Sequence, residues 1–383
     1  MNILDKKKVV VGISGGIDSF MTALLLKNKG YDVIAVHLDL WDDNELLNDV
    51  SSAKKDFKDV KYLCDFLKIP LFIIDGKELF KRTIINYFIN EYLVGRTPSP
   101  CVFCNSQIKW QLLKDVADKL NIYNIATGHY VRKVFFDNEK GLYYIRRGID
   151  SIKDQSYYLW ELKQDILSRM LTPLGEYTKD EIRAMAKREG FNNILNKRES
   201  MSICFLAKYS YGDFISKYIK QDYSINDKNY LSDKGLINYS NFINNKGCFL
   251  LEDGTNLGKH KGILYYTIGQ KKNVPLSPDG KKLYVIKIDE QTKNIILGSK
   301  SSLFVSKFRI NNLNINNYKD LDSSQIKIAI RGVGLNPKGY VKIKRLALDN
   351  IEIKLSDPAW AMAPGQPVVM YIDDRVIGGG VVF

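Results

Sequence analysis

The sequence contains a short glycine- and serine-rich segment, Ser14-Gly15-Gly16-Ile17-Asp18-Ser19, that is suited to binding phosphate. It follows a β-branched run at 8–13 and precedes a segment at 17–29 whose apolar residues have helical spacing. At such a turn, glycines let several backbone N–H groups face one point, and the helix N-terminus adds partial positive charge. The segment lacks the Gly-Lys-Ser/Thr of a Walker A loop and the G-x-G-x-x-G of a dinucleotide fold. It therefore predicts a phosphate cradle, and a turn without any ligand is the alternative.

Two of the five cysteines form a C-x-x-C pair, Cys101 and Cys104, in a loop with two prolines. Helical spacing begins at 107, which would place Cys104 at a helix N-terminus where Asn105 or Ser106 can cap. A helix N-terminus favours the thiolate, so we predict a lowered pKa for Cys104. Half of a zinc site and a pair of packing cysteines are the alternatives, although no second C-x-x-C or paired histidine completes a set of four zinc ligands.

Three further segments carry polar or reactive side chains. His129 lies in Ala126-Thr127-Gly128-His129-Tyr130, at the end of a predicted strand, where open α/β sheets bind ligands. It could contact a nucleotide or RNA, or be a structural histidine. The segment 153–158 could be a helix cap, and Cys204 lies in an apolar run, where a lone cysteine is usually a core residue. Taken singly, these segments establish no function.

Strands and helices alternate over the first 130 residues. The pattern predicts strands at 8–13, 33–38, 70–74 and 124–127, and helices at 17–29, 54–68, 78–93 and 107–120. This alternation is typical of an open, mostly parallel α/β sheet. Because ligands bind at the carboxyl ends of parallel strands, the glycine-rich segment and His129 should face the same crevice.

The pattern changes after Gly128. A hairpin is predicted from 131–136 and 141–147, followed by helices near 158–170 and 179–189. From about 213 short strands dominate, and from about 306 to 383 almost no helical pattern is left. We therefore expect an α/β domain at 1–212, a central β-rich domain at 213–305 and a C-terminal β-barrel at 306–383.

Charge and composition limit the class of protein. The 57 Lys and Arg and 43 Asp and Glu leave a net charge of +14. This surplus favours a polyanionic partner, because basic side chains displace the counterions condensed on a phosphate backbone. A basic protein without such a partner is the alternative. No apolar run has the roughly 20 residues of a membrane span, and the first residues do not read as a secretory signal. We therefore expect a cytoplasmic protein that does not contact a membrane.

Together these segments resemble a known family. Residues 12–19 are similar to the pyrophosphatase loop, or PP-loop, of enzymes that cleave ATP between its α- and β-phosphates. That loop, Pro-Cys-x-x-Cys-Asn, Ala-Thr-Gly-His-Tyr, Lys-Asp-Gln-Ser and Ser-Ile-Cys-Phe, in this order and spacing, resemble the tRNA-specific 2-thiouridylases, which replace the C2 oxygen of the wobble uridine (U34) with sulfur. The likeness spans essentially the whole chain, through 258–262, 266–271 and 363–366. It implies a PP-loop domain of the adenine nucleotide alpha hydrolase type, a small central β-rich domain and a C-terminal β-barrel.

The resemblance also implies roles for residues. Cys104 matches the family's catalytic nucleophile, and Cys204 matches the cysteine that carries sulfur as a persulfide. The residues implied to bind ATP are Gly12, Ile13, Ser14, Gly15, Gly16, Ile17, Asp18, Ser19, Leu38 and Gly128. Those implied to contact the target base or tRNA are Ser99, Pro100, Cys101, His129, Lys153, Asp154, Gln155, Arg331, Gly332 and Gln366. Two positions depart from the family: Ser99 stands where Asn is usual, and Gly332 stands where an aromatic residue is expected. A serine hydroxyl can still make one hydrogen bond to a base.

The implied reaction uses ATP and Mg²⁺. Transfer of AMP to the C2 oxygen would make that oxygen a good leaving group, and sulfur from a Cys204 persulfide would replace it. Cys104 would then release the product by forming a disulfide with Cys204, or would free sulfide for the attack. The two cysteines are 100 residues apart, so the Cys204 segment must fold back over the crevice. We expect it to be mobile and to order when tRNA binds.

The implied partners are tRNA and a sulfur donor. Lysine, glutamate and glutamine tRNAs are expected, held by the anticodon arm, and a cysteine desulfurase or a sulfur-relay protein would supply the persulfide. The wobble base lies in a single-stranded loop, so it can be splayed out without breaking a helix. Four basic hairpin residues are candidate contacts to the RNA backbone, or else part of a solvated face: Arg132, Lys133, Arg146 and Arg147.

Two other classes of protein stay open. One is a PP-loop ligase or amidotransferase acting on a small metabolite, which would need neither the +14 charge nor two positioned cysteines. The other is a non-catalytic RNA-binding or nucleotide-sensing protein that keeps the fold.

Overall fold

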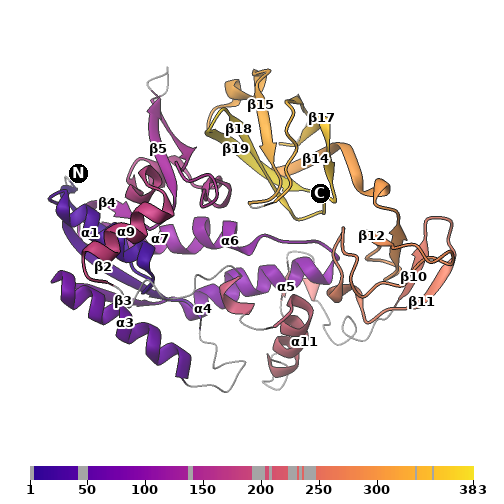
Figure 1. The fold of residues 1–383 in the computed structure, drawn as a ribbon, viewed down its shortest axis with the longest axis horizontal. Coiled ribbons are helices and arrows are strands. Elements are labelled where there is room, and N and C mark those ends of the chain that lie inside the picture. Colours follow the sequence, from indigo (N-terminus) through magenta and orange to yellow (C-terminus); the bar gives the residue numbers. More distant parts are fainter. Residues whose placement is uncertain are drawn as a thin grey trace.

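The structure is a computed structural model that describes residues 4–41, 51–136, 141–191, 203–206, 209–222, 231–232, 235–236, 247–332, 334–346 and 349–383. Its N-terminal part is a five-stranded parallel sheet in the order β3-β2-β1-β4-β7 (Figure 1). The strands are β1 (Asp5–Gly12), β2 (Asp32–Asp39), β3 (Leu71–Asp75), β4 (Ile122–Ala126) and β7 (Met170–Leu171). Val10 of the central strand pairs with Ile34 on one side and Ile125 on the other.

Helices cover both faces of this sheet. The helices of the described residues are α1 (Ile17–Asn28), α3 (Ser51–Leu67), α4 (Lys77–Phe80), α5 (Asn86–Leu93), α6 (Pro100–Phe103), α7 (Trp110–Lys119), α8 (Gln164–Leu167), α9 (Lys179–Arg188) and α11 (Tyr211–Asp222), of which α5 and α11 pack in a core apart from the sheet. Val9 and Val11 pack with α1, α3 and α9 on one face, whereas Val10 packs with α7 on the other. These three valines have no exposed surface. A strand buried on both faces explains the continuous apolar run in the sequence.

Two stretches of π-helix interrupt the helical segments beside the sheet. Lys81–Ile85 joins α4 to α5, and Cys104–Lys109 joins α6 to α7. Single turns of 3₁₀-helix occur at Ser156–Tyr158, Pro173–Glu176, Cys204–Leu206, Ile263–Tyr265, Ser301–Leu303 and Tyr318–Asp322.

The C-terminal part forms two β-rich units. A four-stranded sheet in the order β11-β10-β13-β12 lies at the end of the molecule far from the N-terminus (Figure 1). Its strands are β10 (Cys248–Leu251), β11 (Asn256–Lys259), β12 (Tyr284–Ile288) and β13 (Ile295–Gly298), and the short strands β8 (Leu231–Ser232) and β9 (Gly235–Leu236) pair with each other. The last unit is an antiparallel sheet in the order β15-β18-β19-β14-β17-β16. It consists of β14 (Phe304–Ile315), β15 (Ile326–Ala329), β16 (Val341–Arg345), β17 (Ile351–Trp360), β18 (Pro367–Ile372) and β19 (Arg375–Val382).

The hairpin of β5 (Val131–Phe136) and β6 (Leu142–Arg147) connects the first and last units. Its two strands pair with each other, and β6 also pairs with β19, with Arg146 opposite Arg375. The hairpin was predicted as an element of the N-terminal domain. In the structure it extends the C-terminal sheet to eight strands.

Three predicted elements are wrong. The helix expected from 107 begins at Pro100, a position that favours proline because its missing N–H needs no partner in the first turn. The helix expected near 158–170 is mostly absent. Its apolar side chains, Leu159 and Trp160 among them, are buried against residues of β18 and β19 instead. Short strands were expected from about 213, but α11 is there.

Helix α11 also lies across residue 212, where the first domain was expected to end. Its apolar residues Phe214, Ile215, Tyr218 and Ile219 have helical spacing and pack in one core with residues of α5. The domain limits themselves stay a prediction.

Candidate active site

The glycine-rich segment lies between the end of β1 and the start of α1. The Ser14 N–H donates to Ser19 Oγ at 3.1 Å, and the Ser19 hydroxyl donates to the Gly16 carbonyl at 3.0 Å. Gly15 has a φ of +77°, which glycine adopts without strain. Gly16 caps α1 without a side-chain hydrogen bond to the first turn. The first-turn N–H groups of α1 thus have no side-chain cap and can bind an anion.

Gly128 lies directly against this turn. A Cβ atom on Gly128 would lie 2.9 Å from the Asp18 carbonyl carbon and 3.0 Å from the Ser19 nitrogen. Both are backbone atoms, so only glycine fits. The two segments predicted to share a crevice, 14–19 and 126–130, are therefore adjacent. Leu38, which the sequence also placed beside ATP, is half-buried near the end of β2.

A polar network that sequence reasoning missed holds the loop in place. The Lys179 ammonium donates to both carboxylate oxygens of Asp18 at 2.8 Å, and the Tyr130 hydroxyl donates to Asp18 Oδ1 at 2.8 Å. The Lys179 side chain is only 6% exposed, whereas that of Asp18 is 34% exposed, so the ammonium is buried and the carboxylate is partly open to solvent. Lys179 is 161 residues from Asp18, so no local pattern could indicate the contact.

The structure brings three of the five cysteines into one cluster. Cys104 is 5% exposed, Cys101 is half-buried and Cys204 is exposed. Cys101 and Cys104 both lie close enough to Cys204 for its charge to raise their pKa values. Phe205, the residue after Cys204, anchors this part of the chain. Its side chain is 2% exposed, and its ring lies 5.1 Å from that of Phe88 in α5.

The predicted direction of the Cys104 pKa is wrong. Cys104 occupies the second turn of a helix that starts at Pro100, so it is not at the N-terminus. Burial raises the pKa of Cys104 to about 12, Lys109 lowers it in part, and the charges of Cys204 and Cys101 raise it further. Burial likewise raises the pKa of Cys101. The protein alone therefore holds Cys104 as a neutral thiol.

Lys109 interacts electrostatically with both the thiols and His129, which is next to Gly128 and hence close to the glycine-rich loop. Burial alone would lower the pKa of Lys109, but its charge interactions with Cys104, Cys204 and Cys101 raise it overall. His129 accepts from or donates to the Thr127 hydroxyl at 2.7 Å and stacks on the Trp110 ring at 6.1 Å between centroids. Burial, with a smaller effect of Lys109, lowers the pKa of His129 to about 3. The imidazole is therefore neutral.

The C-terminal unit packs beside the segment predicted to touch the target base. Ser99 caps α6 and Pro100 begins it, and just before them the Thr97 N–H donates to the Pro364 carbonyl at 2.7 Å. Gln366 accepts from the Ala363 N–H at 2.9 Å through its side-chain oxygen, which fixes this turn.

Gly332 also lies near this segment. A Cβ on Gly332 would lie 2.4 Å from the Tyr158 hydroxyl, so the phenol fills the space that a larger residue at 332 would need. Burial raises the pKa of Tyr158, and the charge of Cys101 adds to the effect. Arg331 donates through NH2 to the carbonyls of Trp360 and Ala361 at 3.1 and 2.8 Å. Much of its hydrogen-bonding capacity is thus used within the protein.

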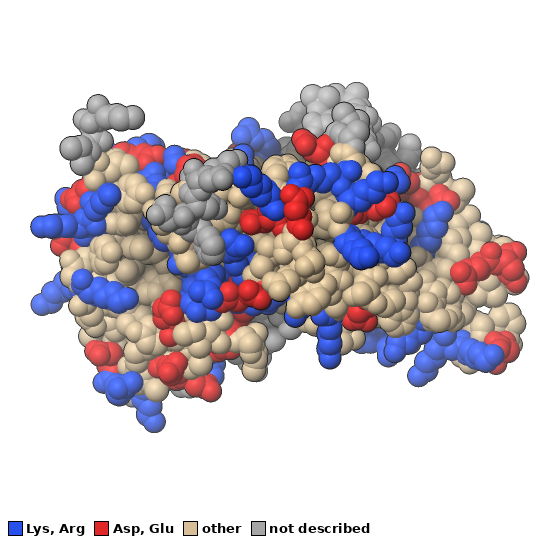
Figure 2. All heavy atoms as spheres, turned by 90° about the horizontal axis from the view of Figure 1, so that it is seen from above, with Lys and Arg blue, Asp and Glu red and all other residues tan. Residues whose placement is uncertain are grey.

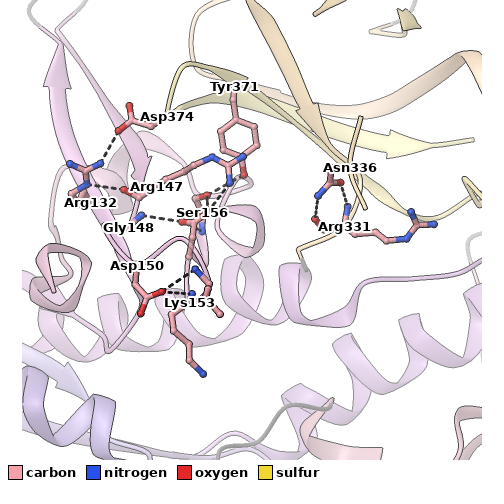
Figure 3. Close-up of polar contacts among 12 residues, drawn as sticks. Arg132, Arg147, Gly148, Asp150, Lys153, Ser156, Arg331, Asn336, Tyr371 and Asp374 are labelled. Carbon is pink, nitrogen blue, oxygen red and sulfur yellow. Dashed lines mark hydrogen bonds and ion pairs between the residues drawn. The ribbon is translucent and has the colours of Figure 1, made fainter. Parts of the chain in front are cut away.

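The segment 153–155 is held by hydrogen bonds to neighbouring parts of the protein, and Figure 3 shows the surroundings of Lys153. Asp154 accepts from Arg147 at 3.1 Å, from the Gly148 N–H at 3.1 Å and from the Ser156 hydroxyl at 2.8 Å. Gln155 accepts from the Tyr130 N–H at 3.0 Å. These two side chains position their neighbours. Lys153 extends away from the cluster in Figure 3.

Comparison with known proteins identifies the family. Three domain profiles match, described as tRNA methyl transferase HUP domain (residues 7–208), tRNA methyl transferase PRC-barrel domain (240–299) and aminomethyltransferase beta-barrel domain (305–382). The chain is 38% identical to tRNA-specific 2-thiouridylase MnmA 1 of Caldanaerobacter subterraneus, over 98% of this chain and 97% of that protein. It is 35% identical to tRNA-specific 2-thiouridylase MnmA of Carboxydothermus hydrogenoformans, over 100% and 99% of the two chains. The chain belongs to the tRNA-specific 2-thiouridylase family.

This membership confirms the resemblance, the enzyme class and the PP-loop fold expected from the sequence. A solved structure of a 4-thiouridine synthetase–RNA complex with bound ATP matches at a TM-score of 0.34 and 16% identity, over 56% of this chain and 50% of that one. That overlap is low, so the family assignment depends on the relatives.

The hairpin arginines of this thiouridylase-family chain have partners within the protein. Arg132 pairs with Asp374 at 2.8 Å (Figure 3). Arg146 pairs with the same carboxylate at 2.8 Å, and Arg147 pairs with Asp154 at 3.1 Å. Lys133 donates to the Ser168 carbonyl at 3.0 Å, and burial lowers its pKa to about 8. These contacts attach the hairpin to the rest of the molecule. Arg146 and Arg147 stay 41% and 43% exposed, so a contact of these side chains to an RNA backbone stays a prediction.

A row of lysines crosses the C-terminal sheet instead. Lys354 of β17 is paired in register with Lys307 of β14 on one side and with Lys342 of β16 on the other, and all three are exposed. Like charges directly opposite each other destabilise a sheet. At one end of the row the charge of Lys307 is compensated within the sheet, because its ammonium pairs with Glu352 at 2.9 Å. Seen from above, the molecule shows many Lys and Arg side chains along its middle, interspersed with acidic ones (Figure 2).

The described residues contain no group of three or more His, Cys, Asp or Glu side chains placed to hold a metal ion. Asp18 is paired with Lys179 and Tyr130, so a Mg²⁺ at the loop would take most of its ligands from nucleotide oxygens and water. Within the same described ranges, no helix has the length and apolar character to cross a membrane.

Proposed function

We propose that this protein converts the C2 oxygen of the wobble uridine of tRNA to sulfur, at the expense of ATP. The observation that carries the proposal is the convergence of Cys204 on Cys104 and Cys101. The tight contact between Gly128 and the loop at 14–19 adds a phosphate cradle in the same part of the fold. A phosphate cradle next to a pair of thiols supports activation of an oxygen by AMP transfer, followed by sulfur transfer.

ATP is a substrate in this proposal. The loop N–H groups and the start of α1 would bind its phosphates, with Ser14 and Ser19 as hydroxyl donors. Transfer of AMP to the uridine C2 oxygen releases pyrophosphate and turns that oxygen into a good leaving group. His129 is neutral, so it adds no positive charge beside the loop.

The exposure of the cysteines supports a division of roles. Cys204 is exposed and can reach the active cysteine of a donor protein, such as a cysteine desulfurase or a sulfur-relay protein, whereas Cys104 is 5% exposed. The sulfur would therefore be loaded on Cys204. Residues 192–202, which precede Cys204, lie outside the described residues. The expectation that this segment orders when tRNA binds concerns those residues and stays a prediction.

Sulfur transfer in this proposal takes two nucleophilic attacks. The terminal sulfur anion of the Cys204 persulfide attacks C2, and AMP leaves with the former C2 oxygen. The Cys104 thiolate then attacks Cys204 Sγ, forming a Cys104–Cys204 disulfide and releasing the 2-thiouridine. An external thiol reduces the disulfide. Alternatively, Cys104 attacks the persulfide first and frees hydrosulfide, which attacks C2; the same disulfide forms. Both orders require a Cys104 thiolate.

The C-terminal sheet supports binding of the anticodon arm. The lysine row across β14, β17 and β16 offers contacts to phosphates. The turn at 363–366 contacts the segment before Ser99, so RNA held by this unit would lie close to the proposed base site. Which tRNAs bind, with lysine, glutamate and glutamine acceptors expected, is part of the proposal.

The test is thiolation of an unmodified tRNA transcript with ATP and a persulfide donor, with nucleosides measured by mass spectrometry. We expect 2-thiouridine with the wild type and with Cys248→Ser, and none with Cys104→Ser or Cys204→Ser. Cys248 is the matched control because it is half-buried in β10 of the central sheet. Thiolation by Cys104→Ser at the wild-type rate would contradict the proposal. A methylated product instead would favour the activity named in the family profiles.

A further inference from the structure

Lys109 is a half-buried cation, and no acidic side chain in the part of the chain that the structure describes neutralises it. Among the described residues it takes part in no salt bridge or side-chain hydrogen bond. A charge removed from water is costly unless an opposite charge accompanies it. The titratable groups whose charges interact with Lys109 are the Cys101, Cys104 and Cys204 thiols and the His129 imidazole. None of these is a carboxylate.

The local backbone directs Lys109 towards the thiols. Cys104 and Lys109 are the first and last residues of a π-helical segment. On an α-helix, two residues five apart point about 140° away from each other. The wider π-turn brings residue i+5 back towards the face of residue i, and such turns occur often at functional sites. The π-segment thus explains how one helix presents both a thiol and an ammonium to Cys204.

We propose that Lys109 is a positioning residue for sulfur transfer: its ammonium pairs with the sulfur anions that form on Cys204 and Cys104 during turnover. This inference rests on the proposed function. A persulfide is more acidic than a thiol and is therefore the anion expected first in the cluster, followed by the Cys104 thiolate. Each step of the proposed reaction consumes one sulfur anion, and a single fixed cation beside both sulfurs serves both.

The alternative anion is a phosphate of the nucleotide, because Lys109 also interacts with His129 next to Gly128. Two observations favour sulfur. Three thiols interact with Lys109, and Cys104 lies in the same π-turn, whereas the phosphate cradle is at the start of α1.

The test is the rate at which iodoacetamide modifies Cys104, followed by peptide mass spectrometry as a function of pH, in the full-length protein. In Lys109→Met the rate should fall roughly 10- to 100-fold at each pH, because the thiolate loses its charged partner. Lys109→Arg should retain most of the rate. Lys114→Met is the matched control, since Lys114 is on α7 and pairs with Asp118 at 2.9 Å. Thermal melts establish that each variant is folded, and Lys109→Gln replaces Lys109→Met if that protein does not fold.

Sulfur transfer provides the second readout. Single-turnover thiolation from a preloaded Cys204 persulfide should slow by the same factor in Lys109→Met, with unchanged affinities for ATP and tRNA. A weaker ATP affinity with an unchanged alkylation profile would overturn the inference in favour of a phosphate contact, and an alkylation profile equal to that of the wild type overturns it in any case. A wild type that alkylates as expected but makes no 2-thiouridine would instead overturn the proposed function.

Discussion

Replacing Gly128 by alanine tests whether the nucleotide loop depends on one close backbone contact. The added Cβ would lie 2.9 Å from the Asp18 carbonyl carbon, 3.0 Å from the Ser19 nitrogen and 3.1 Å from the Asp18 oxygen. Since these are backbone atoms of α1, whose first turn is held by the Asp18–Lys179 pair, no side chain can move aside to relieve the overlap. Overpacking of this kind costs about 1–3 kcal/mol.

That cost should appear in both stability and ligand binding. We expect the melting temperature of Gly128→Ala to fall by on the order of 5 °C. If α1 shifts to relieve the overlap, the affinity for a non-hydrolysable ATP analogue should fall roughly tenfold or more, since about 1.4 kcal/mol is a factor of ten. Differential scanning fluorimetry and isothermal titration calorimetry measure the two effects.

Gly16→Ala is the matched control for this prediction. A Cβ on Gly16 would meet only the Ser14 hydroxyl, at 3.6 Å, which is an ordinary contact. Its melting temperature should therefore stay near that of the wild type, while ATP binding weakens if phosphate lies against this glycine. Wild-type stability and wild-type ATP affinity in Gly128→Ala would refute the claim that this contact shapes the loop.

Four further changes have defined outcomes. Because burial raises the pKa of Cys104 to about 12, alkylation of this thiol should be slow at neutral pH, and its rate should rise about tenfold per pH unit into the alkaline range. Peptide mass spectrometry measures the labelling, and fast labelling at neutral pH would contradict this expectation. Asp374→Asn removes the ion pairs to two hairpin arginines and should lower the free energy of unfolding by about 1–3 kcal/mol in chemical denaturation, whereas equal stability would show that the hairpin docks without them. Asp18→Asn leaves the buried Lys179 ammonium without its carboxylate and should lower the free energy of unfolding by about 3 kcal/mol. Adding Lys179→Met should recover much of this loss, and a double variant less stable than Asp18→Asn would count against the reasoning. Lys354→Glu should weaken tRNA binding and reduce the salt dependence of the logarithm of the binding constant by about one unit, and an unchanged slope in filter binding would remove this lysine from the RNA surface.

Local patterns correctly predicted that the loop at 14–19 and Gly128 lie side by side, and their role in binding a nucleotide stays a proposal. The loop at 14–19 and Gly128 could be found because a glycine-rich turn after a strand has few other uses. The sequence also gave reason to single out Cys104 and Cys204, each within a short motif. No local pattern could predict that the two cysteines lie close together, because 100 residues separate them. Only the proposed reaction, which needs both thiols at one site, gave a reason to expect it.

Predictions from the sequence were wrong where tertiary packing decides whether a side chain is buried or a segment is helical. Cys104 was expected to be acidic because the helix was expected to start after it, at 107, but the helix begins at Pro100 and the thiol is buried. The apolar residues near 160 fit a helix as well as they fit an irregular segment buried under a barrel. Lys179 and Lys109 look like any other lysines in the sequence. Their importance comes from a distant carboxylate in one case and from a π-turn in the other.

The attachment of the β5–β6 hairpin to β19 affects how the chain can fold during synthesis. Arg146 and its partner Asp374 are 228 residues apart, so the ribosome releases the hairpin long before the strand that completes its sheet exists. Until then one hairpin edge has no partner strand, and such edges are prone to pair with other chains. A nascent chain stopped before Arg375 would therefore present this open edge beside a parallel sheet that has all its strands once β7 has been made.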